Sequence, residues 1–464
     1  MSENDRLKML AKLPPIVLVD GFMSDNREDY WGPIEALATK MVGSECTHCH
    51  RRLLCSTREG YRRRVIRVSP GCTSSVHDRA CEIYYQLKGG TVDYGEEHAA
   101  KYGHARYGRS YQGLYPQWSP EKPLHFIGHS LGGNTLLGLQ VLLANRHFYP
   151  RSTLPSMMLS LTTLSAPLNG TPLVYWMGAR SDGQPGDVWP GSMGWCIGRA
   201  IQLYESFGMR FGYDFNLDHW GWRRTDAART QAVLARNHTW LATLADAAGH
   251  AWTKSGRVVA SLLHSPCYDT ADNLSVDSVP RACAERNAAW SPCERTWYRS
   301  YTSEMQIPSG HAANATSVWL FRQIRRILHR CMAGAFADAK DCGVSIGRCV
   351  RCQRPDDWYR DDGVIPLPSQ MHPGCCCNSE LQCAHSTLSL NSTRSKRPLP
   401  NASQLLSAGH WETVAITGPH HVGIVPYVEP AAGSGSSSIW TTVFADYTRW
   451  LHQVDCAHVA VALQ

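Results

Sequence analysis

The chain has 464 residues, 43% of them hydrophobic, and a formal net charge of +7 at pH 7. This composition indicates a globular protein with a sizeable core. No run of about 18 apolar residues is present, so the sequence predicts no membrane-spanning helix. The basic residues are scattered and accompany no nucleic-acid-binding motif, which favours a solvated face over an anionic lipid surface or a nucleic acid as partner.

The cysteines leave the cellular compartment open. The chain has 18, including Cys46-x-x-Cys49, Cys349-x-x-Cys352 and the run Cys375 to Cys377 with Cys383, a pattern that fits disulfides, a small zinc knuckle or free thiols. Six glycosylation sequons lean towards secretion: Asn169, Asn237, Asn273, Asn314, Asn391 and Asn401. Residues 1–13 are charged and lack an apolar signal core, so a cytoplasmic location is the alternative.

The N-terminal part of the chain predicts two strands and a helix. Pro15 to Val19 is a compact apolar run that indicates a buried strand, and the glycine-containing loop Asp20 to Ser24 follows it. Residues 31–41 predict a helix, and residues 65–68 predict a second strand. The loop at 20–24 is either a plain strand-end connection or part of an active site.

Residues 76–108 bring together an aspartate and two histidines. Asp78 opens a predicted helix, and His98 and His104 lie around a glycine-containing turn. Two imidazoles with carboxylates are an acceptable tetrahedral zinc set. Histidines at surface turns are more often solvated, so this spacing alone does not establish a metal site.

The segment Leu124 to Leu137 carries the clearest chemical signal. An apolar run ends in Gly128-His129-Ser130-Leu131-Gly132, and a helical apolar pattern follows. This is the G-x-S-x-G nucleophile turn of α/β-hydrolases, in which glycines permit a strained serine between strand and helix. Ser130 is the predicted nucleophile, and the backbone N–H groups of Leu131 and Phe22 are the predicted oxyanion donors. Ser345 sits in a second G-x-S-x-G match that lacks the strand and helix, so we interpret it as chance.

Several separated blocks resemble one family. They are residues 78–108, the run Leu161 to Pro167, and Tyr213 to Gly221. With the serine turn and two later blocks, they resemble the large zinc-containing lipases of the staphylococcal and thermophilic-bacillus type from about residue 14 to residue 427. The resemblance implies an α/β-hydrolase fold with a mostly parallel sheet flanked by helices. It also implies a structural zinc ion held by four residues: Asp78, His98, His104 and Asp218.

The resemblance also supplies the acid and the base. Asp361-Asp362-Gly363-Val364 is similar to the family's acid block, which implies Asp362 as the catalytic aspartate with Asp361 as the fallback. His420-His421-Val422-Gly423-Ile424 is similar to its histidine block and implies His421 as the base. The order serine, aspartate, histidine is that of α/β-hydrolases. The family's calcium ligands are replaced by Gly423 and about Val428, so a calcium site is doubted, although Glu429 offers partial compensation.

The downstream elements complete the predicted domain. Residues 171–212 correspond to the family's lid, or to a core helix; residues 225–263, 317–333 and 439–454 predict helices, and 297–302 a strand. We expect one α/β-hydrolase domain over residues 14–455. Its insertions are a zinc loop (72–115), a cap or lid (171–310) and a surface loop (370–407).

The predicted function is hydrolysis of acylglycerol esters by a Ser130–Asp362–His421 triad at a lipid–water interface. The alternatives are an acyltransferase or phospholipase on the same triad, because the serine turn does not specify the acyl acceptor. A catalytically inactive lipid-binding protein is the alternative from a different class.

Overall fold

The protein is described from a computed structural model. The described residues are 13–22, 24, 28–34, 63–149, 151–180, 188–206, 213–221, 268–306, 316–341, 355–374, 383–388, 407–426 and 439–462.

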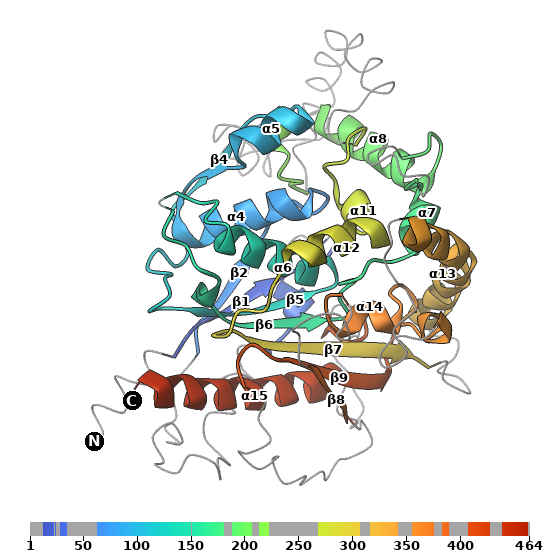
Figure 1. The fold of residues 1–464 in the computed structure, drawn as a ribbon. Coiled ribbons are helices and arrows are strands. Elements are labelled where there is room, and N and C mark those ends of the chain that lie inside the picture. The colour runs from blue at the N-terminus through green and yellow to red at the C-terminus, as the bar shows by residue number, and fades with distance from the viewer. Residues whose placement is uncertain are drawn as a thin grey trace, which may run out of the picture.

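A sheet of seven strands in the order β2-β1-β5-β6-β7-β9-β8 forms the centre of the molecule (Figure 1). Each neighbouring pair is parallel. All residues of β1, β5 and β6 are buried, which explains why the sequence shows these strands as continuous apolar runs. The predicted α/β fold with a mostly parallel sheet is therefore confirmed. The strands are β1 (Ile16–Val19), β2 (Val65–Val68), β5 (Leu124–His129), β6 (Met158–Leu164), β7 (Trp297–Met305), β8 (Cys383–Leu388) and β9 (Trp411–Gly418).

Helices cover both faces of this sheet. In Figure 1, α4 (Val76–Lys88) and α6 (Leu131–Ala144) lie above it, and α15 (Ile439–Ala462) lies below. The first face buries a cluster that includes Leu136 and Leu139, and the second a cluster that includes Phe444 and Leu451. Burial of such side chains contributes about 1.5–3 kcal/mol each. Two apolar layers thus hold the sheet, as in other α/β domains.

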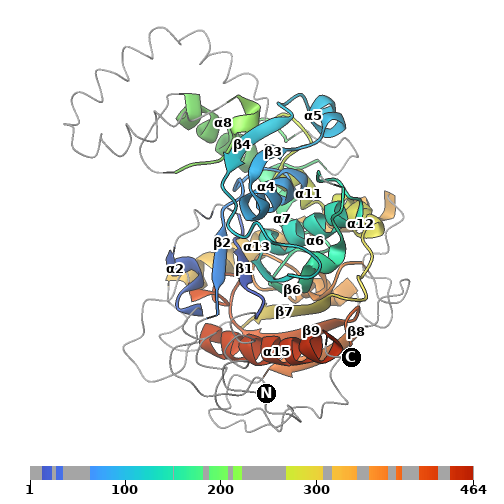
Figure 2. The same cartoon turned by 90° about the vertical axis from the view of Figure 1, so that its left-hand side faces the viewer.

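Most of the remaining elements lie on the face that α4 and α6 cover or at the ends of the strands (Figure 1). The two-stranded antiparallel sheet β3–β4 lies close to α5 and α8 at one end of the molecule (Figure 2). The other described elements are β3 (Gly90–Asp93), β4 (Tyr107–Tyr111), α2 (Glu28–Trp31), α5 (Glu96–Tyr102), α7 (Leu173–Met177), α8 (Met193–Ser206), α11 (Leu274–Asp277), α12 (Pro280–Ala289), α13 (Thr316–Asp341) and α14 (Leu367–Met371), with short 3-10 turns at Pro155–Met157, Asp218–Trp220 and Pro355–Tyr359.

The strand order changes direction between β1 and β5. The chain passes from β1 outward to β2 on one side, and from β5 outward to β6 on the other. Clefts form at the carboxyl ends of strands where the order reverses in this way. Because Val19 is in register with Gly128, the loop after β1 and the turn after β5 leave the sheet side by side. The sheet therefore places Phe22 and Ser130 at one edge.

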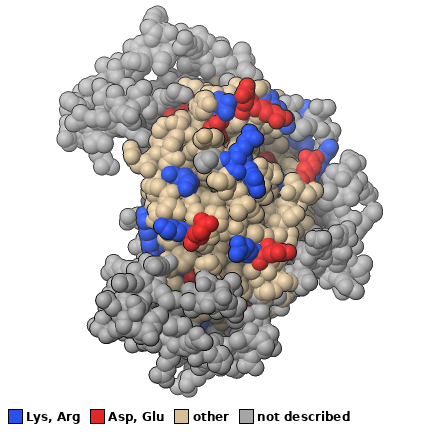
Figure 3. All heavy atoms as spheres, turned by 60° about the vertical axis from the view of Figure 1, so that its left-hand side comes forward, with Lys and Arg blue, Asp and Glu red and all other residues tan. Residues whose placement is uncertain are grey.

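Three further findings bear on the sequence predictions. The segment 370–407, expected to be a surface loop, contains β8, an edge strand of the central sheet. Among the described residues, no helix has the length and apolar character needed to cross a membrane. On the described part of the face in Figure 3, lysine and arginine side chains are interspersed with aspartate and glutamate.

Candidate active site and metal site

The turn between β5 and α6 holds Ser130 in a strained conformation. Its φ is 53° and its ψ is −128°, values that few non-glycine residues adopt. The flanking glycines are required by space: a Cβ at Gly128 would lie 2.6 Å from the carbonyl carbon of Gly132, and a Cβ at Gly132 would lie 2.3 Å from the carbonyl oxygen of Val19. The turn therefore packs directly against the end of β1.

Ser130, His421 and Asp362 form a continuous hydrogen-bonded chain. The Ser130 hydroxyl lies 2.9 Å from Nε2 of His421, which can accept its proton. On the other side of the ring, Nδ1–H donates to Oδ2 of Asp362 at 2.8 Å. Asp362 is fully buried, and Ser130 and His421 are each 7% exposed. The structure thus brings together three residues that lie far apart in the sequence, each from a loop at the carboxyl edge of the sheet.

The carboxylate of Asp362 is fixed by backbone amides. Its Oδ1 accepts hydrogen bonds from the N–H groups of Val364 and Ile365 at 3.0 and 2.8 Å. The fallback residue Asp361 faces elsewhere, and its carboxylate pairs with Arg325 and His329. Of the two adjacent aspartates, Asp362, the preferred candidate, is the one that contacts His421.

The loop after β1 contacts the serine turn. A Cβ at Gly21 would lie 2.9 Å from Cβ of Ser130, so only glycine permits this approach. Phe22 follows directly, and Leu131 is the first residue of α6, where backbone N–H groups have no helical acceptor. Both residues line the cavity that contains Ser130. Their positions suit the oxyanion role that the sequence predicts for them.

His129 has a structural position that the sequence did not reveal. Its Nε2–H donates to the backbone carbonyl of His421 at 3.1 Å, and the Tyr30 hydroxyl donates to its Nδ1. Burial, followed by the charge of His421, lowers the pKa of His129 to about 3, so the ring is neutral. Tyr30 also accepts a hydrogen bond from the N–H of Gly21. His129 and Tyr30 therefore connect the oxyanion loop to the backbone of His421.

A cavity of about 310 Å³ opens beside Ser130 and His421. Apolar side chains of α7, α11, α13 and the loops that carry Asp362 and His421 form most of its wall: Leu173, Val174, Met177, Leu274, Phe321, Val364, Ile365 and Val422. A pocket of this kind, apolar with a few polar groups at one point, is typical of small-molecule sites.

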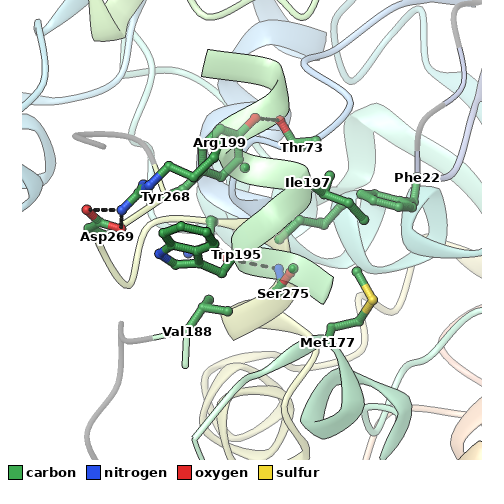
Figure 4. Close-up of a pocket in the computed structure, with 14 residues that line it drawn as sticks. Phe22, Thr73, Met177, Val188, Trp195, Ile197, Arg199, Tyr268, Asp269 and Ser275 are labelled. Carbon is green, nitrogen blue, oxygen red and sulfur yellow. Dashed lines mark hydrogen bonds and ion pairs between the residues drawn. The ribbon is translucent and has the colours of Figure 1, made fainter. Parts of the chain in front are cut away.

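A smaller pocket of about 30 Å³ adjoins the first, which is room for about one water molecule. The two share Phe22, Met177, Leu274 and Ser275. Phe22 and Met177 lie at one side of the view in Figure 4. At the opposite side, Arg199 donates to Asp269 at 2.9 Å. Phe22 thus contributes to the walls of both spaces.

A second cluster of ionisable side chains lies near the start of α4. Asp78, His98, His104 and Asp272 each offer one atom to a group whose members lie within 4.8 Å of one another. Nε2 of His98 is 3.2 Å from Asp78 and 3.3 Å from Asp272, and Nε2 of His104 is 3.2 Å from Asp272. A tetrahedral ion bound at 2.0–2.1 Å separates its ligands by about 3.3–3.4 Å. The spacing therefore fits a metal ion.

The hydrogen bonding of this cluster fits a cation as well. One atom of each residue is buried without a hydrogen bond: Oδ1 of Asp78, Nε2 of His98, Nε2 of His104 and Oδ2 of Asp272. Nδ1–H of His104 donates to the carbonyl of Ala105 at 3.0 Å, which leaves a lone pair on Nε2. Burial lowers the pKa of His98, but contacts with Asp272 and Asp78 outweigh it and raise the pKa to about 9. The negative charge at this point favours a cation.

The fourth member of the cluster is Asp272 and not the predicted Asp218. Asp218 lies at the start of a 3-10 turn, where its carboxylate pairs with Arg109 and is not part of the cluster. The next residue, His219, contacts the cluster instead, because its Nε2–H donates to Oδ2 of Asp78 at 3.0 Å. Asp272 takes the fourth place, directly before Asn273, whose side chain caps α11. In the sequence, the only local feature that marks Asp272 is its place directly before the helix-capping Asn273.

Some predictions fall outside the described residues. These include Ser345, the cysteine pairs at 46 and 349, the cysteine run at 375, the helices at 225–263 and most of 31–41, and the positions 428 and 429 considered for calcium. Among the described residues, five cysteines are free thiols: Cys72, Cys81, Cys196, Cys293 and Cys331.

Comparisons with known proteins agree with this geometry. Residues 12–149 match the family model of the lipase-like, C-terminal domain. The chain is 32% identical over 394 residues to a lipase of Staphylococcus epidermidis, an alignment that covers 80% of this chain and 47% of that protein. The chain thus spans about half the length of the curated relatives that it matches.

Two solved structures share the fold. The crystal structure of Staphylococcus hyicus lipase gives a TM-score of 0.59 at 21% identity and covers 96% of each chain. EstA from Clostridium botulinum gives a TM-score of 0.55 at 23% identity, covering 95% of this chain and 87% of that one. The parallel sheet and these matches place the protein among the α/β-hydrolases. Within that class, the chain belongs to the staphylococcal-type lipase family, which confirms the family inferred from its sequence blocks.

Proposed function

We propose that the protein hydrolyses carboxylic ester bonds of acylglycerols, with Ser130 as nucleophile, His421 as base and Asp362 as orienting acid. The hydrogen-bonded chain of these three side chains beside an apolar cavity carries the proposal. An activated serine, a histidine within reach and a buried carboxylate are the parts that acyl transfer requires.

In the first half of the reaction, Oγ of Ser130 attacks the ester carbonyl while Nε2 of His421 takes its proton. The carboxylate of Asp362 holds the ring with Nδ1 protonated, so that Nε2 is free to accept. The backbone N–H groups of Phe22 and Leu131 stabilise the oxyanion that forms. Each such donor contributes about 10²–10³ in rate.

His421 then donates the proton to the leaving alcohol, which ends the first half and leaves the acyl group on Ser130. In the second half, water attacks the acyl-enzyme, with His421 again accepting a proton at Nε2. The fatty acid leaves, and Ser130 regains its hydrogen. Each proton passes through the single imidazole nitrogen that faces the serine.

The surface around the cavity supports a lipid substrate presented at an interface. Trp176 is 42% exposed, Trp319 56% and Leu320 46%. Trp176 precedes Met177, and Leu320 precedes Phe321, and both of these following residues line the cavity. Exposed apolar side chains grouped beside a binding site are typical of surfaces that meet lipid or another apolar partner.

We further propose that Asp78, His98, His104 and Asp272 hold a zinc ion. Two imidazole nitrogens and two carboxylate oxygens suit Zn²⁺ in a closed, structural site, where it supplies four bonds that cross-link the chain. Asp272 is followed by Leu274 and Ser275, which line the cavity. A bound ion would thus tie the cavity wall to α4, to α5 and to the loop after α5.

The test is hydrolysis of emulsified triglyceride by Ser130→Ala, with Ser110→Ala as the matched control because Ser110 is exposed on β4. We expect Ser130→Ala to keep its far-ultraviolet circular dichroism and to lose activity by at least about 10⁴, while Ser110→Ala retains activity. Full activity in folded Ser130→Ala contradicts the proposal.

A further inference from the structure

His77, Cys81 and His147 form a second group of metal-ligating side chains, next to the cluster at Asp78 but sharing no residue with it. The three ligand atoms lie within 4.8 Å of one another. His77 and Cys81 are four residues apart on α4, so they project from the same face of the helix. His147 follows the end of α6, which packs against α4 through Gly138 and Val76.

The separation of Cys81 and His147 is close to that of two ligands on one metal ion. Sγ of Cys81 lies 3.8 Å from Nε2 of His147. A tetrahedral zinc with bonds of about 2.3 Å to sulfur and 2.0–2.1 Å to nitrogen separates these two ligands by about 3.6 Å. The His77 and His147 rings meet edge to face, with centroids 5.2 Å apart. A Cβ at Gly95 would lie 2.9 Å from Cε1 of His147, so this glycine leaves the space that the ring occupies.

A hydrogen bond from one ring nitrogen fixes the orientation of His77, as is usual for metal-binding histidines. Its Nε2–H donates to the backbone carbonyl of Tyr94 at 2.8 Å, which leaves Nδ1 with a lone pair. An imidazole anchored through one nitrogen and open at the other is oriented to bind a metal ion.

Cys81 is unsuited to the other common uses of a buried cysteine near histidine. Burial, and then the charges of Asp78, Glu82 and Asp93, raise the pKa of the Cys81 thiol well above its usual value. A nucleophilic or redox-active cysteine requires a lowered pKa and access to solvent, and Cys81 is fully buried. A bound dication displaces the thiol proton.

We propose that His77, Cys81 and His147 bind a second metal ion, and that the ion is Zn²⁺ with water as its fourth ligand. A thiolate with two imidazoles is a borderline-soft donor set that Zn²⁺ prefers over the hard cations calcium and magnesium. The ion joins the N-terminal part of α4 to the segment after α6. The first site has only nitrogen and oxygen ligands, so sulfur distinguishes the two sites.

The test replaces the bound metal of the full chain with Co²⁺, because a cobalt–thiolate bond gives a charge-transfer absorption that nitrogen and oxygen ligands do not. We expect Cys81→Ser to lose about one equivalent of cobalt together with part of this absorption. Cys196→Ser, which removes an exposed cysteine of α8, is the control and should match the unsubstituted chain. His104→Asn should lose about one equivalent of cobalt from the first site and keep the thiolate absorption.

His147→Gln covers the case in which Cys81→Ser fails to fold, because His147 is only partly buried. We expect it to lose the same equivalent of cobalt and the same absorption as Cys81→Ser, with unchanged circular dichroism. If folded His147→Gln retains the cobalt content and the thiolate absorption of the unsubstituted chain, the three residues hold no metal and the Cys81–His147 contact is only a hydrogen bond.

Discussion

The substitution Asp362→Asn tests the arrangement of the acid and the base in detail. In the structure, Oδ1 of Asp362 accepts two backbone N–H groups, and Oδ2 accepts Nδ1–H of His421. In an asparagine at this place, the amide oxygen must take the position of Oδ1, since an NH₂ group there would face two donors. The NH₂ group therefore points to Nδ1 of His421.

This orientation forces the wrong tautomer of the histidine. With Nδ1 acting as an acceptor, the proton resides on Nε2, which then cannot receive the proton of Ser130. The loss of a correctly protonated base in such a triad lowers kcat by about 10⁴, or about 5 kcal/mol of transition-state stabilisation. The shape and burial of the side chain hardly change, so we expect the fold to persist.

The assay is kcat on a soluble short-chain ester, with Asp361→Asn as the matched control. Asp361 pairs with Arg325 and His329 rather than with His421. We therefore expect its variant to keep kcat within about tenfold while losing about 1–3 kcal/mol of stability from a weakened buried charge pair. Equal losses in kcat for the two variants, or an Asp362→Asn enzyme within tenfold of the unsubstituted chain, would refute the reasoning.

Three further predictions concern the metal site, the serine turn and His129. Asp272→Ala should lower the zinc content by about one ion per chain, measured by atomic emission, whereas Asp218→Ala should leave it unchanged; the reverse result restores Asp218 as the ligand. Gly132→Ala should cost about 1–3 kcal/mol in chemical denaturation, because its Cβ would lie 2.3 Å from a carbonyl oxygen of β1; an unchanged midpoint argues against this packing. Because the pKa of His129 falls from 6.5 to about 3 on folding, the unfolded chain takes up a proton there below about pH 6.5. Between pH 6 and 4, the free energy of unfolding of the unsubstituted chain should therefore fall by about 1.4 kcal/mol per pH unit more than that of His129→Leu. Parallel plots of unfolding free energy against pH for the two proteins would count against this.

The sequence predicted those parts of the site that depend on local chain geometry. The turn at Ser130 is specified by two glycines within five residues and by the apolar strand before it. The parallel sheet follows from continuous apolar runs such as Pro15 to Val19. Asp362 and His421 were identified through a family resemblance, and their meeting with Ser130 is a consequence of the sheet, which brings three loops to one edge.

The parts that the sequence missed depend on tertiary contacts. Asp218 begins a 3-10 turn and Asp272 precedes a short helix, so the two have similar local settings. Only the folded structure shows that Asp218 pairs with Arg109 while Asp272 joins the histidines. The role of His129 depends on Tyr30 and on a carbonyl almost three hundred residues later in the chain. β8 lies in a cysteine- and serine-rich segment without apolar alternation, so its pairing with β9 left no periodic signal.

The most direct test of the proposed chemistry is to label the chain with a fluorophosphonate and map the modified peptide by mass spectrometry. The proposal predicts one adduct, on Ser130, that forms in parallel with the loss of esterase activity and fails to form in His421→Ala. An active preparation that carries no label on Ser130, or whose label lies on another serine, would contradict it.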